Sequence, residues 1–197
     1  IIGSVKEDLT TEKRISITPE SAKKFIDLKF SVFLQKNYAE HLGIADAEYK
    51  TKGVNFYNSA KEVLEKSEII LKVNCPLVDE INLIKDKSML IGQFDPLLNK
   101  EMINKLIKKD VKIFSLNLLP RIARAQSMDV LSSQANLAGY RAVIESVKEY
   151  EKVVPMMMTA AGTIIPAKVL VIGAGVAGLQ AIATAKRLGG IVSATDV

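Results

Sequence analysis

The sequence contains one cysteine, one histidine and no tryptophan. With Cys75 as the only thiol, no internal disulfide can form, which is typical of a protein in a reducing compartment. His41 has no cysteine or second histidine at ligand spacing, so we interpret it as a surface or packing residue. We therefore expect no metal site in this chain.

The chain also lacks a strong charge imbalance. Its formal net charge is +5, and the lysines are spread along predicted helix faces, as at 23–24 and 108–109. No basic stripe is interleaved with aromatic residues, which argues against nucleic-acid binding and leaves an anionic partner of another kind open. With 48% hydrophobic and 25% charged residues, the 197 residues have the composition of a soluble globular protein with one large or two small domains.

One long stretch is nearly free of charge. Residues 156–185 carry Lys168 as their only charged residue and are long enough to span a bilayer. Pro166 and four glycines interrupt the stretch, and Lys168 lies within it, so we reject a membrane helix. We expect instead a loop to Ala167, a buried strand at Val169–Ile172, a glycine turn and a helix from Val176 to Leu188.

Strand and helix signals alternate through the first 120 residues. Thr18, Ser59 and Asn99 each precede a helical pattern and are predicted to cap it, and Pro19 suits a first helical turn. Short apolar runs at 1–5, 31–34, 54–57, 69–73, 89–91 and 111–116 are strand candidates, and 45–52, 60–66 and 100–109 are helix candidates. This alternation with short connections predicts a parallel α/β sheet.

The pattern changes after Pro120. Residues 121–135 are polar and irregular, a helical pattern covers Asn136–Lys152, and Pro155 is predicted to end it. We expect an α/β subdomain at 1–135, a bridging helix at 136–155 and the start of a second, Rossmann-like subdomain at 156–197. Because the chain begins inside a strand-like run and stops where a second strand would end, we expect this second subdomain to be incomplete.

The clearest motif follows the strand candidate at 169–172. Gly173 permits a tight turn, Gly175 lets a pyrophosphate approach the backbone, and Gly178 lets a helix pack close to the strand. The free N–H groups at the start of that helix favour phosphate. The same geometry serves NAD and FAD, so the glycines predict a dinucleotide without choosing it.

The strand candidate after the helix, at 191–195, is followed by a residue that favours NAD over NADP. Asp196 falls where a carboxylate can accept both ribose hydroxyls and would repel a 2′-phosphate. The predicted cofactor-binding residues are therefore Gly173, Gly175, Val176, Gly178, Asp196 and Val197.

Three segments carry a resemblance to a known family. Residues 120–141 (PRIARAQSMDVLSSQANLAGYR), 157–162 (MMTAAG) and 176–189 (VAGLQAIATAKRLG) resemble the NAD(H)-binding domain of proton-translocating transhydrogenases, in the alanine dehydrogenase/transhydrogenase family. The resemblance implies two Rossmann-like subdomains with NAD(H) in the cleft between them. It also implies that a loop with Arg121, Gln126, Asp129 and Ser132 reaches the nicotinamide, whereas without it these polar residues would be interpreted as holding the loop.

The same resemblance implies the rest of the enzyme. Hydride would pass between NAD(H) on this chain and NADP(H) on a partner domain, coupled to proton translocation by a transmembrane domain. The chain would be a homodimeric, soluble part on the cytoplasmic or mitochondrial matrix face of a membrane complex, and would bind no nucleic acid.

Two alternatives stay open. Alanine dehydrogenases share the contexts of Arg14 and Lys72, where the resemblance implies cations that hold a substrate carboxylate. The position of their histidine is Gln93 here, and glutamine is neither an acid nor a base, which disfavours amino-acid chemistry. Arg14 and Lys72 are then interpreted as structural, paired with nearby carboxylates. The second alternative is a non-catalytic NAD-sensing module.

Overall fold

The computed structural model describes all residues from 1 to 197. Their contacts divide the chain into two compact units, Ile1–Ile122 and Ala123–Val197, which are described separately. The first holds a six-stranded sheet and the second a smaller parallel pair, so the predicted α/β class is confirmed. The division into units rests on contacts and does not show which segments fold independently. The predicted domains at 1–135, 136–155 and 156–197 therefore stay predictions.

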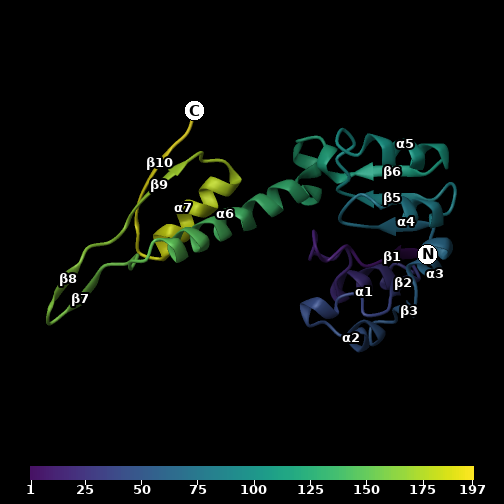
Figure 1. Ribbon diagram of the computed structural model, residues 1–197, viewed down its shortest axis with the longest axis horizontal. Helices are drawn as coiled ribbons and strands as arrows, with labels where there is room; N and C mark the ends of the chain where they lie inside the picture. The colour runs from purple at the N-terminus through teal and green to yellow at the C-terminus, as the bar shows by residue number, and fades with distance from the viewer. The chain divides into compact units, whose positions relative to one another are not determined.

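All strands of the first sheet run parallel (Figure 1). The strands are β1 (Ile2–Ser4), β2 (Val32–Gln35), β3 (Asn55–Tyr57), β4 (Ile69–Leu71), β5 (Met89–Gly92) and β6 (Lys112–Ser115), in the spatial order β3-β2-β1-β4-β5-β6. This is the order of a doubly wound sheet, which reverses between β1 and β4. A crevice is expected at the carboxyl ends of those two strands.

Helices cover both faces of this sheet. They are α1 (Pro19–Asp27), α2 (Asp46–Lys50), α3 (Ala60–Lys66), α4 (Val78–Leu83) and α5 (Lys100–Lys108), with 3₁₀ turns at Glu40–Leu42 and Leu116–Leu118. Thr18 and Ser59 cap α1 and α3 through their side chains, as predicted. The prediction for Asn99 is wrong: its side-chain amide donates to the carbonyl of Phe94, 2.8 Å away, and leaves the start of α5 without a side-chain cap.

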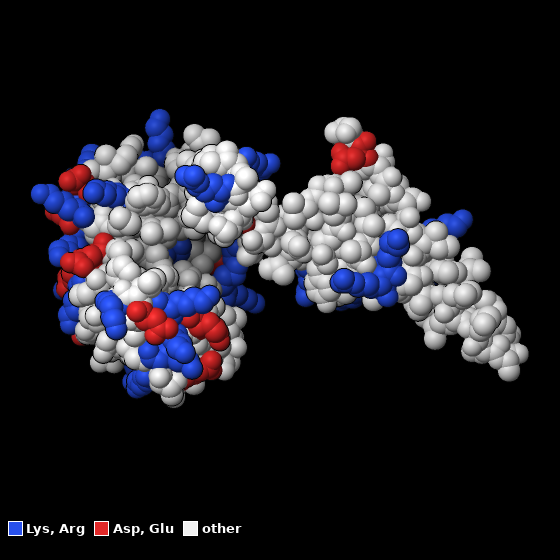
Figure 2. All heavy atoms as spheres, turned by 180° about the vertical axis from the view of Figure 1, so that it is seen from behind, with Lys and Arg blue, Asp and Glu red and all other residues white.

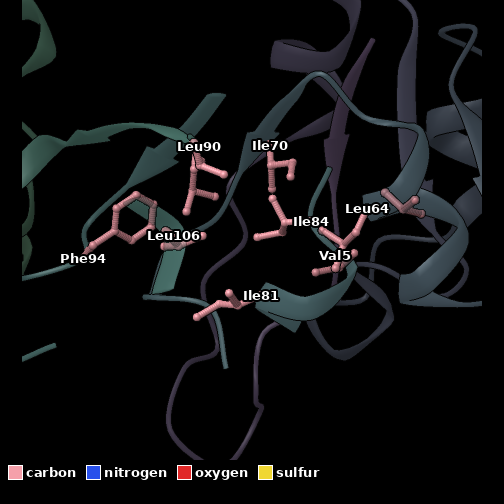
Figure 3. Close-up of a cluster of buried hydrophobic side chains, with 10 residues drawn as sticks. Val5, Leu64, Ile70, Ile81, Ile84, Leu90, Phe94 and Leu106 are labelled. Atoms are coloured by element: carbon pink, nitrogen blue, oxygen red, sulfur yellow. The ribbon is translucent and has the colours of Figure 1, made fainter. Parts of the chain in front are cut away.

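The core consists of two hydrophobic clusters that the pleat of β4 separates. Ile70 packs with Leu64, Leu90 and other side chains of α3, α4, α5 and β5 in the cluster drawn in Figure 3. Its neighbours Ile69 and Leu71 pack against the second cluster, which is built around α1, α2, β1 and β2. Alternate residues of a strand point to opposite faces, so one short apolar strand serves both cores.

The second unit consists of two α-helices, a hairpin and a parallel pair of strands (Figure 1). A 3₁₀ turn at Ala123–Met128 precedes α6 (Val130–Glu149), the antiparallel hairpin β7 (Met157–Thr159) and β8 (Gly162–Ile164), then β9 (Lys168–Ile172), α7 (Val176–Arg187) and β10 (Ile191–Thr195). β9 and β10 pair in parallel from Lys168 with Ile191 to Ile172 with Thr195. Gly139 of α6 lies directly against the backbone of Ala177, so any side chain there would clash with α7.

Three elements differ from the sequence prediction. No element was predicted where α4 lies, the hairpin β7–β8 falls where a loop was expected, and α6 begins at Val130 rather than at 136. Asp129 explains the last difference, because its side chain caps α6 by accepting from the N–H of Ser132. Helix α6 also ends at Glu149, before Pro155 is reached. The nearly uncharged stretch is hairpin, strand and helix, and no helix of the chain is long and apolar enough to cross a membrane.

Candidate functional site

A glycine turn joins β9 to α7 in the second unit. Gly173 has a φ of 96°, in the region that favours glycine, and its N–H donates to the carbonyl of Thr195 at 2.8 Å. A Cβ added to Gly178 would overlap the carbonyl oxygen of Gly173, so only glycine allows α7 to approach the turn this closely. The tight turn at Gly173 and the close helix approach at Gly178 are the two roles that the sequence analysis predicted for these glycines.

The space in front of the turn is open. Gly175 is the N-cap of α7, and a Cβ built on it would meet no atom within 4 Å. The first turn of a helix leaves N–H groups without intrahelical partners, and the helix dipole adds partial positive charge there. The turn therefore combines free donors, a favourable field and room for an anionic group beside Gly175 and Val176.

Asp196 lies beside this turn although it is distant from it in sequence. Parallel pairing of β10 with β9 places Thr195 opposite Ile172, so the residue after β10 reaches the residue after β9. The Asp196 carboxylate accepts from the N–H of Ala174 at 2.5 Å and from the N–H of Val197 at 2.7 Å. These bonds, that of Ala174 foremost, hold the pKa of Asp196 below its ordinary value and so stabilise the charged form that any exposed aspartate has at neutral pH.

The four predicted loop residues fall in both units. Arg121 is exposed in the first unit, and Gln126, Asp129 and Ser132 belong to the second. Asp129 accepts from the N–H of Ser132 at 2.9 Å and from its hydroxyl at 2.6 Å, and the N–H of Asp129 donates to the carbonyl of Gln126 at 3.2 Å. The fold thus brings three of the four together around the start of α6, with the Gln126 side chain exposed. Their contact with a nicotinamide stays a prediction.

A polar pocket of about 660 Å³ lies in the first unit, at the carboxyl ends of the strands. It includes Lys72, which directly follows β4, and Gln93, which follows β5. Lys72 is buried, and its Nζ lies 2.8 and 3.0 Å from the two carboxylate oxygens of Glu80 and 3.5 Å from Glu7. The predicted pairing of Lys72 with nearby carboxylates is confirmed.

Burial and hydrogen bonding set the electrostatics of this region. Burial raises the pKa of Glu7, and the charge of Lys72 and the N–H of Val73, 2.7 Å from Glu7, only partly offset that rise. Arg14 is held on both oxygens of Glu12, at 2.8 Å from Nε and 2.6 Å from Nη2. These bonds lower the pKa of Glu12 and raise that of Arg14.

Sequence reasoning did not identify Glu7 or Glu80. A lysine at the end of an apolar buried strand does signal a carboxylate partner, because an unpaired buried charge is costly. The sequence pattern does not show which carboxylate is the partner, because Glu80 reaches Lys72 only when residues 78–83 fold as α4.

The remaining candidates for metal binding or thiol chemistry are His41 and Cys75. His41 contacts the carbonyl of Lys13 at 2.8 Å on the surface, and no group of three histidine, cysteine or acidic side chains is arranged to hold a metal ion. Cys75 is half-buried in the polar pocket, where burial raises its pKa above the ordinary value of a thiol.

Comparisons with known proteins agree with this geometry. Residues 3–138 match the alanine dehydrogenase/PNT N-terminal domain, and residues 142–197 match the corresponding C-terminal domain. An NAD(P) transhydrogenase subunit alpha protein of Rhodospirillum rubrum is 45% identical over 201 residues, which cover 100% of this chain and 52% of that protein.

Solved structures give the same result. The crystal structure of transhydrogenase from Sinorhizobium meliloti is 46% identical, with a TM-score of 0.95 over 100% of this chain and 59% of the other. An L-alanine dehydrogenase, 24% identical with a TM-score of 0.82, covers 96% of this chain and 52% of its own and shares the fold. The chain spans about half the length of the relatives it matches. On the family matches over both parts of its length, the chain belongs to the alanine dehydrogenase/PNT family.

Proposed function

We propose that this chain is the NAD(H)-binding part of a transhydrogenase that transfers hydride between NAD(H) and NADP(H), coupled to proton translocation by a membrane domain. The observation that carries the proposal is the charged Asp196 carboxylate beside an open glycine turn at the start of α7. Similarity to subunits named NAD(P) transhydrogenase alpha supports the reaction.

The residues present fit a dinucleotide with a free ribose 2′-hydroxyl. A pyrophosphate would lie against Gly175 and Val176, where a Cβ would have filled the space, and would be bound by the free N–H groups of α7. Asp196 and Val197 would hold the adenosine ribose, and a 2′-phosphate would meet the Asp196 charge. When bound, the nicotinamide supplies the hydride, so the protein contributes position and electrostatics.

We propose that the four loop residues at 121–132 position the nicotinamide. The loop offers the guanidinium of Arg121, the amide of Gln126, the carboxylate of Asp129 and the hydroxyl of Ser132. These groups match the hydrogen-bond donors and the acceptor of a carboxamide. Asp129 and Ser132 are mutually bonded at the start of α6, which fixes both side chains before a ligand arrives. A fixed site loses less entropy on binding and sets the distance that hydride transfer requires.

We propose three partners for the chain: an NADP(H)-binding domain, a transmembrane domain and a second copy. The relatives' description as an alpha subunit supports partner subunits. The hairpin β7–β8 supports a homodimer, because residues 153–167 carry no charge and Met158 and Ile165 are 75% and 76% exposed. The complex would hold this chain on the cytoplasmic or mitochondrial matrix face of its membrane.

Alanine dehydrogenase is the second candidate, favoured by the shared fold. The first unit argues against it, because Arg14 and Lys72 are already paired with carboxylates and Gln93, in the polar pocket, offers no acid or base. An NAD-sensing module is the third, and it would bind NADH without transferring hydride.

The choice between NADH and NADPH tests the role proposed for the Asp196 carboxylate. Asp196→Ala in the full protein should weaken NADH binding by about 1–3 kcal/mol, the scale of hydrogen bonds to a charged group, and should narrow the gap to NADPH. Fluorescence titration with both nucleotides measures this, with Asp27→Ala at the exposed end of α1 as the control. Unchanged discrimination in Asp196→Ala would remove Asp196 from the ribose site.

A further inference from the structure

The two long helices of the second unit meet at a glycine. Helices α6 and α7 pack against each other (Figure 1), and Gly139 and Val143 are the two residues of α6 that are buried. A Cβ added to Gly139 would lie 2.8 Å from the carbonyl carbon of Ala177 and would overlap its carbonyl oxygen. Glycine destabilises a helix interior relative to alanine, so the close contact explains this residue better than helix formation does.

The contact falls on the phosphate-binding end of the proposed NAD(H) site. Ala177 is the second residue of α7 and follows the glycine turn directly. The N–H groups of this first turn have no intrahelical partners, and they are the donors proposed for the pyrophosphate. Gly139 therefore lies against the backbone segment that would hold the phosphates.

The same helix carries residues of the nicotinamide end. Asp129 caps α6 and accepts from both the N–H and the hydroxyl of Ser132. Ser132 precedes Gly139 by seven residues, which is close to two full turns and about 10 Å of helix, so both lie on the same face of α6. Between them, α6 is a stiff connection from the proposed nicotinamide residues to the start of α7.

Helix α6 is the element that would yield to a larger residue at this contact. α7 packs on β9 and β10, and Gly178 holds its first turn against Gly173. α6 is less constrained, because a groove of about 420 Å³ lies between it and β9, beside Val143. Ordinary contact with a Cβ begins near 3.4 Å, so a methyl group at Gly139 would move α6 away from α7 by about 1 Å.

We infer that Gly139 is a positioning residue for the nicotinamide of bound NAD(H). By letting α6 lie on the backbone of Ala177, it sets the separation between the loop residues at the start of α6 and the phosphate-binding turn. The inference rests on the proposed function. The proposed reaction moves a hydride, a proton with two electrons, from C4 of NADH to C4 of an oxidised NADP ring on the partner domain, and a misplacement of about 1 Å can slow such a step roughly 100-fold.

The test is Gly139→Ala in the full protein, with three measurements on the same preparation. Single-turnover hydride transfer from saturating NADH to an NADP(H)-binding domain that carries an oxidised NADP analogue should be at least about tenfold slower. The affinity for ADP-ribose, which lacks the nicotinamide, should equal that of the wild type, because the glycine turn is unchanged. The fluorescence emission of bound NADH, which reports the surroundings of its dihydronicotinamide ring, should shift.

Two further variants make the result specific. Ala138→Ser adds one atom at the exposed neighbouring position of α6 and should leave all three measurements at their wild-type values. Val143→Ala loosens the same helix contact without an overlap, and it should slow transfer at least about threefold and shift the emission. It also tests the inference if thermal unfolding shows that Gly139→Ala does not fold.

The inference is overturned if the folded variants at 139 and 143 keep the wild-type transfer rate and NADH emission, because the contact would then serve stability alone. It is also overturned if Gly139→Ala loses ADP-ribose affinity in proportion to rate, since the turn and not α6 would have moved. A wild type that binds NADH but transfers no hydride would count against the proposed function alone. The emission and the ADP-ribose affinity would then decide the role of Gly139.

Discussion

Two alanine substitutions in the glycine turn separate packing from ligand space. Gly178→Ala places a Cβ against the carbonyl of Gly173, which is backbone and has little freedom to yield. Overpacking of this kind costs about 1–3 kcal/mol, with the upper half expected against backbone, and the better helix propensity of alanine returns up to about 1 kcal/mol. The net loss of stability should be about 1–3 kcal/mol.

Gly175→Ala should behave in the opposite way. Its Cβ meets no atom within 4 Å, and its φ of −70° suits alanine. The loss of a glycine N-cap and the reduced entropy of the unfolded chain are each worth up to about 1 kcal/mol with opposite signs, so stability should stay within ~1 kcal/mol of the wild type. The new methyl fills the space proposed for the pyrophosphate, so NADH affinity should fall at least about tenfold, or ~1.4 kcal/mol.

Urea unfolding and NADH titration of the two variants, measured on the same preparations, distinguish these effects. Wild-type NADH affinity in Gly175→Ala would mean that the pyrophosphate does not approach this turn. Full stability in Gly178→Ala would mean that the helix does not need its close approach to the strand.

Two further predictions concern the first unit. Leu90→Ala removes a fully buried side chain from the core and should lower the free energy of unfolding by about 2–5 kcal/mol in urea titrations, and a loss below ~1 kcal/mol would show that the cluster is loosely packed. Glu12→Gln should lose about 1.5–3 kcal/mol of stability at neutral pH. Because the folded-state pKa of Glu12 is lowered, its contribution is present above the ordinary glutamate pKa and is lost as the pH falls below about 4, so wild type and variant should converge in acid. A gap that persists at low pH would exclude ionisation of Glu12 as its source.

Local signals predicted the elements that local chemistry determines. Ser59 and the apolar spacing behind it gave α3 with its observed bounds, because the capping box is complete within four residues. The glycine turn was predictable for a similar reason: its three glycines and their neighbours act on adjacent backbone. The position of Asp196 beside the glycine turn was predictable from the strand–helix–strand spacing, which determines where the second strand ends.

The missed features carry weak signals in the sequence itself. Helix α4 is six residues long and has no capping side chain before it, and Glu80 holds it by bonding both Leu77 and Lys72. The hairpin β7–β8 has six exposed strand residues, so no alternation of buried and exposed positions marks it.

Figure 2 shows charged residues of both signs mixed over the body of the first unit, in keeping with their even spread in the sequence.

The pocket illustrates the limit of sequence patterns at a functional site. Lys72 and Gln93 were selected from the sequence, but the meaning of Lys72 depends on which carboxylates reach it. Only the fold determines that, because it brings Glu7 from beyond β1 and Glu80 from α4 to the Lys72 ammonium.

Stopped-flow measurement of hydride transfer tests the central claim most directly. The full protein with NADH is mixed with an NADP(H)-binding domain that carries an oxidised NADP analogue, and equilibrium NADH binding is measured in parallel. Transfer should occur, and Arg121→Ala and Gln126→Asn should each slow it at least about tenfold, or ~1.4 kcal/mol of barrier, while weakening NADH binding only a few-fold. The account is contradicted if no hydride reaches the analogue, or if NADH is oxidised by pyruvate and ammonia without it.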